Sequence, residues 1–79
     1  MQYLICDLSI SKNIVRLRKS AKMTQDGTAA RLQLMGVNIS RSRLSMIELG
    51  RLNVPVSMLV ALKTIFKCEY SDFFEGLDS

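Results

Sequence analysis

One short helix in this chain has clear signals for both of its ends, and this constrains the fold more than any other feature of the sequence. Ser40 is a residue type that caps helix N-termini, and Ile39 and Leu44 have the spacing of a hydrophobic staple across such a cap. Gly50 suits the left-handed position that follows a helix C-terminus. Leu44 and Ile47 fall on one face, which we therefore expect to be buried.

Similar signals divide the rest of the chain into short helices. We expect Ser11 to cap a first helix and Thr24 to cap a second, which Gly36 ends. A more apolar helix over residues 56–67 is expected to be central, and Ser71 is expected to cap a last, short one. The residues expected to face inward are Ile10, Ile14, Leu17, Ala21, Ala29, Leu32, Met35, Met58, Leu59, Leu62, Ile65 and Phe66.

Length and composition favour one domain without catalytic chemistry. The chain has 79 residues, of which 48% are hydrophobic, which is enough for one core. We predict an all-α fold, a compact bundle of five short helices, with a domain over residues 12–75, an N-terminal extension over residues 1–11 and a tail over residues 76–79. There is no histidine, and Cys6 and Cys68 lack metal-ligand spacing. We expect reduced thiols, no enzymatic activity, no metal and no cofactor.

The basic residues are concentrated in the central part of the chain. Residues 8–67 contain all eleven Lys and Arg residues but only two acids, Asp26 and Glu48, which gives this stretch a net charge of +9. Such a field attracts polyanions, so nucleic acid and anionic membrane surfaces are the partners to consider. The bases are spread over several helices, which disfavours a membrane surface. A basic face that serves only solubility is the alternative.

Nothing in the sequence indicates secretion or membrane insertion. Residues 1–10 are apolar, but they include Asp7, lack a basic start and contain no long hydrophobic run, so we do not expect a signal peptide. No apolar run approaches the length of a membrane span. We expect a cytoplasmic protein that associates with the nucleoid if the host is bacterial.

Two short helices joined by a turn, with hydrogen-bond donors exposed on the second, are typical of a helix-turn-helix. A helix of this size fits the major groove of DNA, where one arginine can donate to both O6 and N7 of a guanine. The residues expected on the exposed face of the second helix are Arg41, Ser42, Arg43, Ser45 and Met46, with no acid among them.

Four stretches of the sequence, in this order, resemble the phage repressor and Cro-like helix-turn-helix family. They are NIVRLRK at residues 13–19, MTQD at residues 23–26, SRSRLSMIELGR at residues 40–51 and DFFE at residues 72–75. The resemblance extends over nearly the whole chain. It implies a lambda-repressor-like DNA-binding domain that acts as a transcriptional regulator, most simply a repressor.

The resemblance also implies roles for individual positions. Gln25 matches a glutamine that contacts the DNA backbone and supports the recognition helix, and Arg51 matches a basic residue that contacts phosphate. Arg18 and Glu48 match a pair joined by a salt bridge between the first helix and the recognition helix. The base-reading positions fall on Arg41, Ser42, Arg43 and Met46, with Ser45 beside them. Without such a role, Met46 would only cover the rim of the core.

The sequence departs from the family pattern in four places. Residues 33–39 make the turn longer than in compact members, so we expect the second helix to extend further and the loop to contact the DNA backbone. Leu49 replaces a common asparagine. Thr28 stands where leucine is usual, and Lys67 stands where glycine is usual.

We expect a homodimer on a two-fold operator in double-stranded DNA, because one short module reads too few base pairs for tight specific binding. The expected dimer surface consists of Phe73, Phe74 and Leu77, with residues 3–5 as the alternative surface. Two other functions stay open. One is an antitoxin or restriction-control regulator with a protein partner. The other is a protein-interaction bundle that binds DNA weakly and without sequence preference.

Overall fold

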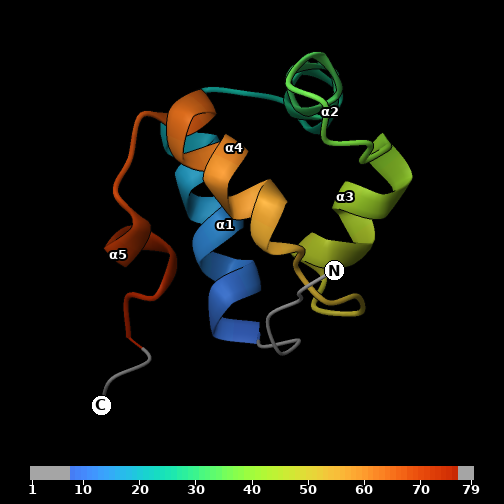
Figure 1. Cartoon of the computed structure of the whole chain (residues 1–79). Coiled ribbons are helices and arrows are strands. Elements are labelled where there is room, and N and C mark those ends of the chain that lie inside the picture. Colours follow the sequence, from blue (N-terminus) through green and yellow to red (C-terminus); the bar gives the residue numbers. More distant parts are fainter. Residues whose placement is uncertain (1–7, 77–79) are drawn as a thin grey trace.

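The computed structural model describes residues 8–76, which form five helices and no strand (Figure 1). This confirms the all-α prediction. The predicted domain limits stay a prediction. The helices are α1 (Leu8–Ser20), α2 (Gln25–Leu34), α3 (Arg41–Glu48), α4 (Val56–Phe66) and α5 (Tyr70–Phe73).

All five helices contribute to one hydrophobic core. Each has at least one apolar side chain with no exposed surface: Ile14, Leu32, Leu44, Met58 and Phe73. Burying a side chain of this size stabilises a fold by about 1.5–3 kcal/mol relative to leaving it exposed. α2 packs against α3 and α4, while α1 packs against α3 and α5. Figure 1 shows α3 and α5 on opposite sides of the bundle, with α1 and α4 between them.

The first four helices all end with the same backbone geometry. A residue with positive φ follows each helix: Lys22 at 58°, Gly36 at 83°, Gly50 at 76° and Lys67 at 54°. The N–H of the next residue then donates to a carbonyl five residues back, at 2.9–3.1 Å, as in a Schellman motif. The predicted ends at Gly36 and Gly50 are thus confirmed. The two lysines thus have a left-handed backbone conformation, which is unfavourable for any residue with a Cβ atom.

The start of α1 differs from the prediction. α1 begins at Leu8, so Ser11 lies inside the helix and is not its N-cap. Ser11 is only 1% exposed and shares the buried side of α1 with Ile10 and Ile14. The apolar stripe begins at Ile10, ahead of the serine, and the helix follows the stripe. A serine hydroxyl is tolerated inside a helix, so its residue type alone does not mark a helix start.

Smaller corrections concern the ends of three other helices. Met35 is 47% exposed because it lies beyond the last turn of α2, so it does not face the core. α4 ends at Phe66, one residue before the predicted end. The N-cap of α5 is Glu69 and not Ser71. The Glu69 N–H donates to Asp72 Oδ2 at 2.9 Å, which satisfies a backbone group at the helix start.

Candidate nucleic-acid interface

α3 has the cap and the buried face predicted for it. The Ser40 hydroxyl accepts a hydrogen bond from the Arg43 N–H at 3.2 Å. Ile39, just before the cap, is buried together with Leu44 and Ile47. This anchors one side of α3 in the core and fixes which of its side chains face outward.

The outward side of α3 carries hydrogen-bond donors and no acid. Its first turn is at a helix N-terminus, where unpaired backbone N–H groups add partial positive charge. The predicted base-reading residues all lie on this helix: Arg41, Ser42 and Arg43 are exposed, Met46 is 36% exposed and Ser45 is half-buried.

The only acid of α3, Glu48, is used inside the protein. Arg18 of α1 donates to its carboxylate from Nε at 2.8 Å and from Nη2 at 3.2 Å. Gln25 Nε2 of α2 donates to the same carboxylate at 2.9 Å. The side chains of Arg18 and Glu48 are 12% and 5% exposed, and Arg18 Nη1 also donates to the Met23 carbonyl at 2.8 Å. One carboxylate thus joins three helices and fixes the orientation of α3.

A second contact joins the starts of α2 and α3. Asp26, in the first turn of α2, has its Oδ1 atom 3.4 Å from Nε of Arg41, the first residue of α3. The two side chains are 79% and 65% exposed. Sequence reasoning counted Asp26 only as one of the two acids in residues 8–67, and it did not predict this pair. The only signal in the sequence was that Asp26 directly follows Gln25, which was expected to support the recognition helix.

The comparison with protein families agrees with this geometry. The sequence profile of the helix-turn-helix family matches residues 14–73, from α1 to the end of α5. The chain belongs to this family. It therefore carries a DNA-binding domain of the type found in transcriptional regulators, which confirms the resemblance seen in the sequence. Neither the comparison with characterised proteins nor that with solved structures gave a match.

The connection between the two helices of the helix-turn-helix spans residues 35–40. α2 runs two residues beyond Leu32, as the longer turn predicted. Gln33 Nε2 donates to the Ile39 carbonyl at 3.3 Å and ties the loop to the end of α2. A shallow hollow of about 300 Å³ beside α3 is lined by Gly36, Val37, Asn38, Ile39, Arg43, Pro55 and Ser57. Contact between this loop and a DNA backbone stays a prediction.

Thr28 shows how the helix-turn-helix accommodates a hydroxyl at an apolar position. Its side chain has no exposed surface, and Oγ1 donates to the Thr24 carbonyl at 2.8 Å. Thr24 itself caps α2, as predicted, because its side chain accepts from the Gly27 N–H at 2.9 Å. The buried hydroxyl is therefore hydrogen-bonded within its own helix, which removes the cost of burying it unpaired.

Three basic residues that follow α3 in the sequence differ in their surroundings. Arg51 is exposed just past the end of α3, and its backbone N–H closes the last turn by donating to the Met46 carbonyl at 2.9 Å. Lys63 of α4 lies with its ammonium 5.4 Å from the centre of the Tyr70 ring, on the side of α5. Lys67 is exposed and follows α4. Of these three residues, Arg51 is the nearest to α3 in the sequence.

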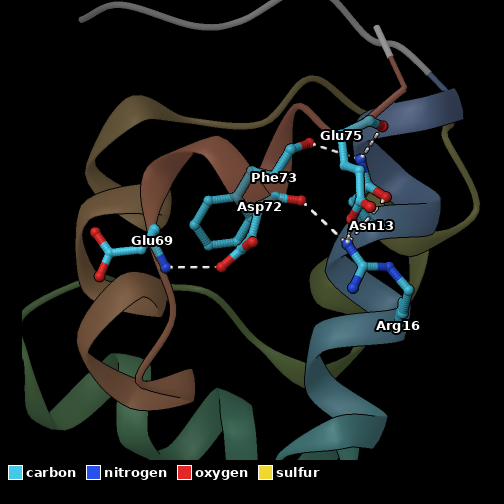
Figure 2. Close-up of polar contacts among 6 residues, drawn as sticks. All are labelled: Asn13, Arg16, Glu69, Asp72, Phe73 and Glu75. Atoms are coloured by element: carbon cyan, nitrogen blue, oxygen red, sulfur yellow. Dashed lines mark hydrogen bonds and ion pairs between the residues drawn. The ribbon is translucent and has the colours of Figure 1, made fainter.

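A cluster that sequence reasoning missed attaches α5 to α1 (Figure 2). Asn13, which is 8% exposed, donates from Nδ2 to the carbonyls of Phe73 and Glu75, each at 2.9 Å. Arg16 Nη2 donates to Glu75 Oε2 at 2.8 Å and to the Asp72 carbonyl at 3.2 Å. Arg16 thus pairs with an acid near the C-terminus of the chain. The only sequence signal was a polar residue beside an apolar stripe.

The expected dimer surface fits the structure only in part. Phe73 has no exposed surface and packs inside its own chain, so a second copy cannot reach its ring. Phe74 is 38% exposed. Leu77 and the alternative surface at residues 3–5 lie outside the described residues. Dimerisation stays a prediction, and Phe73 does not take part in it directly.

Two kinds of site are absent over residues 8–76. No group of three His, Cys, Asp or Glu side chains in this range could hold a metal ion. Likewise, no helix in the part of the chain that the structure describes is long and apolar enough to cross a membrane.

Cys68 is half-buried, and this burial raises the pKa of its thiol. The carboxylates of Asp72 and Glu69 raise that pKa further.

Proposed function

We propose that this chain is a sequence-specific transcriptional regulator that binds double-stranded DNA with α3 in the major groove. The observation that carries the proposal is the two-sided character of α3. Leu44 and Ile47 fix one side in the core, while the other side exposes arginines and hydroxyls without an acid. A helix presented in this way can donate to base edges from its first turns.

Within this proposal, the residues divide into those that read bases and those that meet the backbone. Arg41 and Arg43, with Ser42 and Ser45, supply donors to base edges, and Met46 supplies an apolar contact that suits a thymine methyl. Gln25 and Arg51 flank α3 and contact phosphates. Arg18 and Glu48 act indirectly, by fixing the angle of the helix.

The proposed regulator is a homodimeric repressor in the cytoplasm, bound to the nucleoid, that blocks a promoter by occupying a two-fold operator. Two copies double the number of base pairs read and so raise specificity. The half-exposed Phe74 ring supports a contact at the C-terminal end. A fusion of the operator to a reporter gene separates repression from activation by the sign of the change.

Selection of bound duplexes from random DNA tests this function, and an enriched palindrome is the expected result. Arg41→Ala is then expected to weaken binding to the selected duplex by about 1–3 kcal/mol while binding to a scrambled duplex hardly changes. Arg51→Ala is expected to weaken binding to both duplexes alike and to lower the salt slope by roughly one. Lys63→Ala, on the side of α5, is the control and should change neither.

Two results would contradict the proposal. Selection that enriches no sequence would favour the protein-interaction bundle with an incidental basic face. Equal losses from Arg41→Ala and Arg51→Ala on both duplexes would show that α3 does not read bases.

A further inference from the structure

We propose that Asp26 is a positioning residue that sets base specificity by holding the guanidinium of Arg41 for contact with a guanine. The inference rests on the proposed function of α3 and deepens it. It assigns a role to an acid that lies beside the DNA-reading residues, where an acid would otherwise only weaken binding.

The geometry of the pair leaves the outer end of the arginine available. The shortest contact joins Asp26 Oδ1 to Nε of Arg41, at 3.4 Å. A carboxylate at Nε restrains the plane of the guanidinium and leaves its outer end for another acceptor. That end can donate to O6 and N7 of one guanine, which is the bidentate contact that distinguishes guanine from the other bases.

The position of Asp26 is unfavourable for DNA binding unless the acid has such a role. It lies in the first turn of α2, where a helix N-terminus would attract phosphate, and next to Gln25, which is proposed to contact the backbone. Its side chain is 79% exposed, so its charge is available to repel phosphates. Between residues 8 and 67 the other acid is Glu48, which is buried in the network with Arg18.

The first turn of α2 contacts both ends of α3. Gln25 donates to Glu48, the last residue of α3, and Asp26 pairs with Arg41, the first. The Gln25 contact orients the helix, whereas the Asp26 contact orients one side chain on it. An arginine whose conformation is already restrained loses less entropy when it enters the groove.

The pair contributes to recognition far more than to folding. Both side chains are mostly exposed in the free chain, and an exposed ion pair adds little to stability. Docking on DNA would remove water from the pair and strengthen the attraction. At the same time, the carboxylate competes with phosphates for Arg41, which disfavours binding at random sequences. Both effects raise the ratio of specific to non-specific affinity.

The test is base preference measured by selection from random duplexes with the wild-type chain, Asp26→Asn, Arg41→Ala and the double variant. Arg41→Ala identifies the base pair that Arg41 reads, because preference is lost there. Asp26→Asn is expected to relax preference at the same base pair. In titrations, the ratio of affinities for the selected and scrambled duplexes should fall roughly fivefold to twentyfold, partly because scrambled binding tightens. In the Arg41→Ala background, Asp26→Asn should not relax that base pair further.

Glu75→Gln is the matched control, because it removes the same charge from an exposed acid that pairs with an arginine, but at the attachment of α5 to α1 (Figure 2). It should leave base preference unchanged. Full preference at the Arg41 base pair in Asp26→Asn would overturn the proposal. An equal fall of the ratio of selected to scrambled affinity, when Asp26→Asn is introduced into the wild-type and the Arg41→Ala chains, would overturn it too. In either case the proposed function would stand, provided that Arg41→Ala still loses preference. A wild-type chain that selects no sequence would instead end the proposed function itself.

Discussion

Replacing Glu48 by alanine should destabilise this helix-turn-helix far more than its single salt bridge suggests. Its carboxylate is 5% exposed and accepts hydrogen bonds at 2.8 and 3.2 Å from Arg18 and at 2.9 Å from Gln25. Glu48→Ala leaves the Arg18 guanidinium, 12% exposed, without its counter-charge. Breaking a buried pair in this way costs about 3–5 kcal/mol, out of a total stability of about 5–15 kcal/mol.

Urea unfolding, followed by the circular dichroism of the helices, measures this loss as a free energy of unfolding. Thermal unfolding measures it as a fall in the melting temperature. A change of 1 kcal/mol shifts the melting temperature of a domain of this size by about 4–8 °C, so Glu48→Ala should lower it by more than about 10 °C. A double-mutant cycle with Arg18→Ala should give a coupling free energy above about 1.5 kcal/mol, since the second substitution removes the charge that the first leaves unpaired.

The pair of Arg16 and Glu75 provides the control for this cycle. Its N–O distance is also 2.8 Å, but its side chains are 46% and 67% exposed. Exposed pairs couple by about 0.2–1 kcal/mol because water screens them and holding both side chains costs entropy. If the Arg18 and Glu48 substitutions were additive within about 0.5 kcal/mol, the buried network would not be what holds α3 in place.

Three further predictions concern other parts of the chain. Lys22→Gly and Lys67→Gly should each stabilise the fold by about 1 kcal/mol in urea unfolding, because glycine adopts positive φ without strain, and a loss would refute this explanation of the helix ends. Phe73→Ala should cost about 3–5 kcal/mol and Phe74→Ala under about 1 kcal/mol, whereas similar losses would contradict the different burial of the two rings. In a Cys6→Ser background at about pH 8, Cys68 should react with iodoacetamide more slowly in the folded chain than in urea, because its raised pKa leaves less thiolate; equal rates would disprove the shift.

Local signals in the sequence were sufficient for the parts of the fold that depend on neighbouring residues. Ser40 and Gly50 predicted both ends of α3, because a cap and a left-handed C-terminal residue act within one turn of the helix. The same reasoning misplaced the starts of α1 and α5. Ser11 and Ser71 have the residue type of a cap, but the backbone there is already helical. Residue type alone does not show whether a serine lies at a helix start or inside the helix.

Contacts between distant parts of the chain were predicted only where a resemblance implied them. Matching positions in related proteins suggested the pairing of Arg18 with Glu48, which is present in the structure. The contacts of Asn13 with α5 and of Asp26 with Arg41 had no such guide. Each depends on how helices far apart in sequence pack together, and neither helix's own periodicity contains that information. The exposed side of α3 could be predicted because exposure on a short helix follows from its buried stripe, whereas contact of its residues with DNA stays a prediction.

The attachment of α5 has a consequence for how freely this end of the chain can change. Of the four hydrogen bonds that join Asn13 and Arg16 to it, three end on main-chain carbonyls, those of Asp72, Phe73 and Glu75. Every residue type offers such a carbonyl. α1 therefore binds mainly main-chain atoms of this segment, and the side chains that matter for the attachment are the Phe73 ring and the Glu75 carboxylate. Evolution or protein engineering can exchange most of residues 70–76 while the anchor persists, which makes this end of the domain a ready place to graft a new function.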